Sequence, residues 1–180
     1  MKIKDMVVVA LFSALTAVLS QVSFPVPFSP VPVTLQTLAV YLTGAVLGSR
    51  KGALALIVYI LTGLFGLPVF SLGRSGLPVL VSPTGGYIFG FVFAAYIIGK
   101  IIEGSGNITF LTGLKAMTAG LLVIYILGVG QLKFILDLSL KEAFVIGALP
   151  YLALEVAKVI MGAYLGGRIR KAVLNVFPDL

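Results

Sequence analysis

The sequence predicts an all-α integral membrane protein with six transmembrane helices and with both termini in the cytoplasm. Of the 180 residues, 59% are hydrophobic and only 11% are charged, and the mean hydropathy is +1.16. Average soluble chains are about 45–50% apolar and about 25% charged. Because one span needs roughly 20 apolar residues, there is room for about six spans. We expect a single membrane domain covering residues 1–180.

The first apolar run extends from Met6 to about Phe24 and follows two lysines. A secretory signal peptide is the alternative interpretation, but no small-residue cleavage site follows this run. Residues 25–32 then contain four prolines, which remove amide donors and favour extended backbone. Because this stretch is also apolar, we expect a structured outer loop that is covered by other parts of the protein.

Five further apolar runs predict the remaining helices, at about residues 34–47, 52–67, 84–102, 108–128 and 143–165. The second helix is short, so we expect it to be buried among its neighbours or continued by the proline-rich loop. A glycine-containing connection, residues 68–83, separates the third helix from the fourth. It ends in a Pro-Thr-Gly-Gly-Tyr motif that can turn tightly into the fourth helix.

The basic residues predict the orientation, because cytoplasmic loops carry an excess of Lys and Arg. Nine lie in the segments predicted to share one side: Lys2, Lys4, Arg50, Lys51, Lys100, Lys115, Arg168, Arg170 and Lys171. The opposite loops hold three, Arg74, Lys133 and Lys141. Both termini are therefore predicted to be cytoplasmic, and the proline-rich and glycine-containing loops are predicted to form an outward-facing lid.

The composition also excludes several chemistries. The chain has no His and no Cys, which removes histidine acid/base catalysis, Ser-His-Asp and Cys-His nucleophiles and the usual zinc, haem and iron–sulfur sites. It also lacks the phosphate-binding loop of ATPases. We therefore expect no metal, no cofactor and no enzyme activity, and energy for transport supplied by a gradient or a partner. The net charge is +7, but the basic residues stand between apolar runs rather than on one face, which does not favour nucleic-acid binding.

Glu155 and Lys158 are the strongest candidate site, because they lie three residues apart on one face of the last predicted helix. Ionisable groups inside a span are costly unless they are paired, and they usually mark a functional site. The alternatives are a structural ion pair or a lysine that extends to the membrane surface. The pair suits a ligand that carries both N–H groups and a carbonyl or carboxylate.

Other candidates flank this pair in the predicted loops and helix ends. Thr34 and Gln36 follow the proline-rich stretch, and a glutamine in an apolar span needs either an interhelical partner or a ligand. The aromatic residues Tyr87, Phe70 and Tyr151 could form the walls of a pocket. On the first helix, Ala10 and Ala14 form a small-xxx-small motif, which permits close approach of another helix or tight packing within the chain.

Several motifs in order resemble the BioY-type biotin-specific substrate-binding subunits of energy-coupling factor (ECF) transporters. They lie at residues 31–38, 66–70, 73–76, 83–87, 90–91 and 150–158, and the resemblance covers nearly the whole chain. It implies six helices and an outward-facing biotin pocket. It further implies a plasma-membrane ABC transporter complex for vitamin uptake, with a transmembrane coupling subunit and two ABC-type ATPases.

With biotin as the implied ligand, the residues themselves suggest that Glu155 and Lys158 contact it and that Arg74, near the lid, pairs with its carboxylate. The resemblance implies that Ala10 and Ala14 dock the coupling subunit. One departure is that Leu154-Glu155 stands where the family usually has Gly-Asp. The alternative functions are a stand-alone gradient-driven carrier or channel for a small solute, an intramembrane enzyme and a structural membrane protein.

Overall fold

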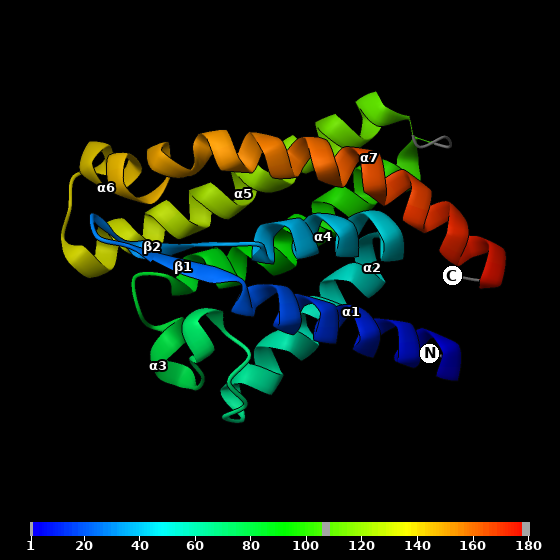
Figure 1. The fold of residues 1–180 in the computed structure, drawn as a ribbon, viewed down its shortest axis with the longest axis horizontal. Helices are drawn as coiled ribbons and strands as arrows, with labels where there is room; N and C mark the ends of the chain where they lie inside the picture. Colours follow the sequence, from blue (N-terminus) through cyan, green and yellow to red (C-terminus); the bar gives the residue numbers. More distant parts are fainter. Residues whose placement is uncertain (1, 106–108, 178–180) are drawn as a thin grey trace.

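The computed structural model describes residues 2–105 and 109–177 and confirms the all-α membrane class (Figure 1). Five helical segments are long and apolar enough to cross a membrane. They are α1 (Ile3–Gln21), α2 (Gln36–Leu64), α4 (Gly85–Gly104), α5 (Phe110–Leu136) and the segment Leu140–Val176. This last segment contains α6 (Leu140–Gly147), a short 3-10 turn, η2 (Leu149–Tyr151), and α7 (Leu152–Val176).

Two of the predicted helices, 34–47 and 52–67, are the two arms of α2. Gly48, with φ of 79°, interrupts the helix between them. A Cβ atom added to Gly52 would lie 3.2 Å from the Cα atom of Gly44. Residues eight apart in a straight helix are about 12 Å apart, so the chain bends sharply here. Glycine suits this place because a left-handed φ costs other residues about 1–2 kcal/mol.

The prediction of one continuous helix over residues 143–165 was wrong, both because the helix is interrupted and because its ends lie elsewhere. The helix stops at Gly147, and α7 begins only after η2, which contains Pro150. Proline lacks the amide hydrogen that an uninterrupted helix would need. α5 begins at Phe110 and runs to Leu136 rather than ending near residue 128. Lys115 and Lys133, which the orientation count assigned to loops, both lie in this helix. The predicted first residue of that helix, Ile108, lies outside the described residues.

The proline-rich stretch forms an antiparallel hairpin of β1 (Ser23–Val26) and β2 (Ser29–Thr34). Ser23 pairs with Thr34 and Val26 with Ser29, and the register is irregular between Phe24 and Val26, on either side of a proline. Phe24 and Thr34 were both predicted to be helical and lie instead in strands. The later glycine-containing connection holds η1 (Ser71–Gly73) and α3 (Leu77–Leu80), so both outer loops are structured as predicted.

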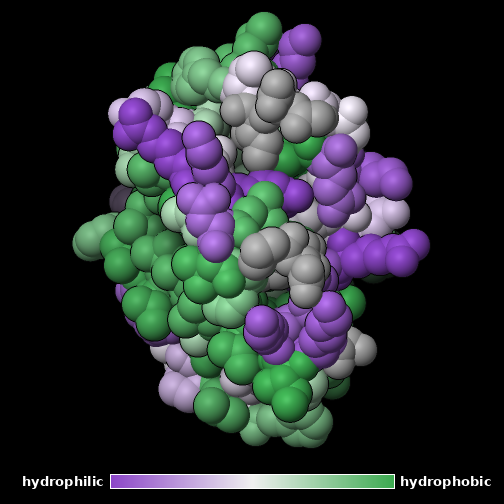
Figure 2. Space-filling model, turned by 90° about the vertical axis from the view of Figure 1, so that its right-hand side faces the viewer, coloured by the Kyte–Doolittle hydropathy of each residue, from purple (hydrophilic) through white to green (hydrophobic). Residues whose placement is uncertain are grey.

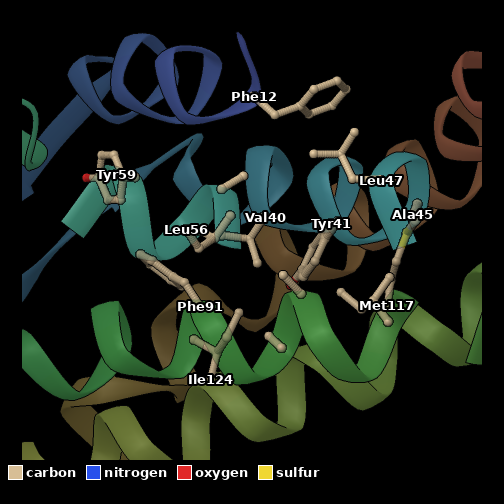
Figure 3. Close-up of a cluster of buried hydrophobic side chains, with 14 of the residues drawn as sticks. Phe12, Val40, Tyr41, Ala45, Leu47, Leu56, Tyr59, Phe91, Met117 and Ile124 are labelled. Carbon is tan, nitrogen blue, oxygen red and sulfur yellow. The ribbon is translucent and has the colours of Figure 1, made fainter. Parts of the chain in front are cut away.

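α2 lies at the centre of the core, with α1 on one side and α4 and α5 on the other (Figure 3). Both termini lie at one end of the bundle, and the hairpin and α6 lie at the other (Figure 1). Hydrophilic side chains form several patches among hydrophobic ones on the end with the termini (Figure 2), which agrees with the predicted cytoplasmic termini. Large apolar side chains are exposed along the helices, as on a lipid-facing surface, for example Leu11, Phe93, Leu122 and Ile126.

Candidate ligand-binding site

A cavity opens at the end of the bundle remote from the termini. About 640 Å³ of space not filled by atoms lies between its walls, a figure that includes solvent at its open mouth. Its walls come from β2, the first turn of α2, the first half of α4, the middle of α5, and the region from Gly147 to Lys158. The hairpin therefore forms one wall, which agrees with the predicted lid.

The predicted charged pair lies in this cavity. Glu155 and Lys158 are only 5% and 7% exposed, and the break at η2 places both in the first two turns of α7. The Lys158 ammonium donates to Glu155 Oε1, to the backbone oxygen of Thr34 at 2.7 Å and to Thr37 Oγ1 at 2.9 Å. A buried cation and anion are thus paired, which removes most of the cost of burying each alone.

Glu155 is held by α2 as well as by Lys158. Thr37 Oγ1 donates to Oε1 at 2.9 Å, and the Tyr41 hydroxyl donates to Oε2 at 2.9 Å. Sequence reasoning missed both residues, although their four-residue spacing puts them on one face of a helix. Together they tie the first arm of α2 to α7 and orient the carboxylate from both oxygens.

Two tyrosines present their rings to the cavity while their hydroxyls are bound to backbone. The Tyr87 hydroxyl donates to the Gly147 oxygen at 2.8 Å, and the Tyr151 hydroxyl donates to the Val31 oxygen at 2.6 Å. The second bond joins the hairpin to η2. Apolar lining residues extend this wall, and sequence reasoning did not single them out because they resemble ordinary core positions: Val31, Ile88, Phe91 and Ile124.

Gln36 satisfies one of its two predicted alternatives and remains on the cavity wall. Its amide nitrogen donates to the Tyr59 hydroxyl at 2.6 Å, which is an interhelical bond across the two arms of α2. The Tyr59 hydroxyl in turn donates to the Val69 oxygen at 3.0 Å. Thr34 also lines the cavity, through β2, and its hydroxyl accepts from the Gln36 backbone amide at 3.2 Å.

Two predicted site residues, Phe70 and Arg74, lie outside the described cavity lining. Phe70 is fully buried, with its ring edge-on to Tyr59 at a centroid distance of 5.6 Å. Arg74 donates from Nε to the Ser71 backbone oxygen at 3.2 Å and from Nη2 to Ser71 Oγ at 3.4 Å. Ser71 itself lines the cavity, so Arg74 supports a wall residue. The other six predicted residues all line the one cavity: Thr34, Gln36, Tyr87, Tyr151, Glu155 and Lys158.

The surface of α1 carries the predicted partner motif. Ala10 and Ala14 are exposed, and large apolar neighbours at helical spacing extend the same surface, among them Val7, Leu11 and Val18. As for metal sites, no group of three or more acidic side chains that could hold an ion is found in residues 2–105 and 109–177.

The sequence is similar to that of a known protein family. Residues 1–175 match the model of the BioY family. "Biotin transporter BioY" of Thermotoga maritima is 38% identical over 168 residues, which cover 93% of this chain and 96% of that protein. "Probable biotin transporter BioY" of Pyrococcus horikoshii is 39% identical over 171 residues, covering 94% and 98%.

A solved structure has the same fold. The crystal structure of the S-component for biotin from an ECF-type ABC transporter superposes with a TM-score of 0.86 at 24% identity, covering 94% of this chain and 92% of that one. The named relatives are transporters. With five apolar spanning helices, this chain is a multi-pass protein of the plasma membrane, as predicted.

Proposed function

The chain belongs to the BioY family, and from that premise we propose that it captures biotin in the cavity between α2 and α7. It would act as the substrate-binding subunit of an ECF-type importer. The observation that carries this proposal is the buried Glu155–Lys158 pair, which lies on the wall of an otherwise largely apolar cavity. A charged group in such a place is costly unless it serves a ligand or a fixed network.

The cavity suits the chemistry of biotin. The ligand has an uncharged urea head with two N–H donors and one carbonyl, an apolar thioether ring and a carboxylate tail. The Glu155 carboxylate can accept a urea N–H, and the ion pair with Lys158 holds that carboxylate in place. The rings of Tyr87 and Tyr151, with Phe91, would pack on the thioether ring. Gln36 and Thr34 supply polar wall contacts.

The chain would deliver biotin inward only with partners. It has no phosphate-binding loop, so ATP hydrolysis would come from two ABC-type ATPases through a transmembrane coupling subunit. The exposed surface of α1 around Ala10 and Ala14 is the proposed docking site, because small residues let another helix approach closely. We propose no catalytic role and no cofactor for the chain itself.

Calorimetry tests the capture step. Protein purified in detergent and freed of bound ligand should bind biotin with 1:1 stoichiometry, and the heat of binding should vanish in Glu155→Ala. Lack of biotin binding by the folded wild-type protein would overturn the proposal. Biotin uptake by vesicles that contain this chain alone would instead favour the stand-alone carrier.

A further inference from the structure

Tyr125 of α5 carries an unpaired hydroxyl on the cavity wall. Its oxygen is buried and has no hydrogen-bond partner, the one such side-chain atom found in the described part of the chain. The residue lines the same cavity as Glu155, Tyr87 and Tyr151. Buried polar groups in native structures nearly always have a partner, so this exception needs a physical explanation.

The neighbouring donors are already occupied. An ammonium group has three hydrogens, and those of Lys158 go to Thr34, Thr37 and Glu155. The hydroxyls of Tyr87 and Tyr151 donate to backbone oxygens. A ligand carbonyl at this end of the cavity could be bound by Lys158 or these tyrosines only if a bond within the protein were broken. Tyr125 can donate without that loss.

Glu155 has a free hydrogen-bond acceptor position, which complements the free donor of Tyr125. A carboxylate oxygen accepts about two hydrogen bonds. Oε1 already accepts from Thr37 and Lys158, whereas Oε2 accepts only from Tyr41. One acceptor position on Oε2, from α7, and one donor on Tyr125, from α5, therefore remain among the residues that line this cavity. An N–H group beside a C=O group, as on the edge of a urea, matches this combination.

We propose that Tyr125 is a ligand-binding residue whose hydroxyl donates to the urea carbonyl, while Glu155 Oε2 accepts the adjacent urea N–H. This inference rests on the proposed biotin function and adds the orientation of the ligand to it. The urea head lies at the Tyr125–Glu155 end, and the carboxylate tail points away from both residues.

The test compares Tyr125→Phe with the wild type by calorimetry. Loss of one hydrogen bond to a neutral carbonyl should weaken biotin binding roughly 3- to 15-fold. The melting temperature of the unliganded protein should not fall, since the hydroxyl has no protein partner. Tyr96→Phe is the matched control: this tyrosine lies on α4, is 43% exposed and is outside the cavity lining, so its affinity should equal that of the wild type.

Biotinol, which has a hydroxymethyl group in place of the carboxylate, tests the orientation. Tyr125→Phe should lose the same factor in affinity for biotinol as for biotin. If the loss disappears with biotinol, the hydroxyl serves the carboxylate and the assigned orientation is wrong. If the wild type binds biotin and Tyr125→Phe binds it equally well, this inference fails while the proposed function stands. If the wild type does not bind biotin, both fail.

Discussion

Two carboxylates hold opposite ends of the first arm of α2, and they do so for different reasons. Glu155, from α7, accepts from Thr37 and Tyr41 near the start of this arm. Glu103, from α4, accepts from the backbone amide of Ser49 at 2.7 Å and from its hydroxyl at 2.8 Å, at the bend where the arm ends. The first carboxylate is buried in a cavity, and the second is exposed at the end with the termini.

At the bend, charged side chains bind backbone groups that the break in α2 leaves unpaired. Glu103 caps the start of the second arm, as an acidic side chain at a helix N-terminus should. Arg170 of α7 donates to the backbone oxygens of Ala45 and Val46, at 3.1 Å and 3.0 Å, near the end of the first arm. These charges replace the helical hydrogen bonds that Gly48 interrupts, so their role is structural.

In the cavity, Glu155 lies in the first turn of α7, but the hydrogen bonds that its carboxylate accepts from the described residues all come from side chains and none from the backbone. Its partners are two hydroxyls and an ammonium group, and Oε2 accepts from only one of them, the Tyr41 hydroxyl. Variants at the bend should therefore change stability without changing ligand affinity. Variants in the cavity should change affinity in every case, and stability only where a charge loses its partner.

The largest effect is expected for Lys158→Met. It leaves the Glu155 carboxylate buried without its cation, which should cost about 3–5 kcal/mol of unfolding free energy and abolish measurable biotin binding. Denaturant unfolding in detergent and calorimetry measure the two effects. The double variant Lys158→Met/Glu155→Gln removes both charges and should regain stability but not affinity. A double variant that binds biotin normally would contradict a ligand role for the pair.

The second largest effect is expected for Gly48→Ala, which should lose about 2 kcal/mol of unfolding free energy. The positive φ of 79° disfavours alanine, and the added methyl would overlap the Glu103 carboxylate. Thermal unfolding measures the loss, and Gly104→Ala, where an added Cβ meets no atom within 4 Å, is the control. Biotin affinity should stay within twofold of the wild type. A large fall in affinity at unchanged stability would show that the bend and the cavity are coupled.

Arg170→Met should cost about 1–2 kcal/mol, because two carbonyl groups lose a charged donor at a site partly reached by water. Lys171→Met, one position further on an exposed surface, is the matched control and should change stability by less than about 0.5 kcal/mol. Equal stability losses in both variants would indicate a general effect of charge near the C-terminus rather than capping of the bend.

The same contrast explains how far the sequence could lead. Apolar runs, the proline stretch and the Glu155–Lys158 spacing each depend on neighbours in sequence, and they predicted the membrane class, the structured loops and the central pair. The sequence could not single out Thr37 and Tyr41 of α2, because they lie more than a hundred residues from Glu155 in the chain. It also could not single out Tyr125 of α5, about thirty residues before Glu155. The roles of all three depend on how these helices pack against α7. The break between α6 and α7 at Pro150 was missed as well, whereas the two arms of α2 match the predicted helices 34–47 and 52–67.

The smallest effect is expected for Arg74→Gln. This variant tests the prediction from the sequence that Arg74 pairs with the ligand carboxylate. As a partner of the ligand carboxylate, Arg74 would be worth several-fold in affinity, and removing its charge would raise the dissociation constant accordingly. In the structure its guanidinium binds Ser71 instead and lies outside the cavity lining. We therefore expect calorimetry to give an affinity within about twofold of the wild type, since the surface bonds that are lost are weak. A tenfold fall that Arg74→Lys restores would mean that residues 68–83 move on binding and bring this cation to the ligand, which would extend the charged part of the site from α7 to the lid.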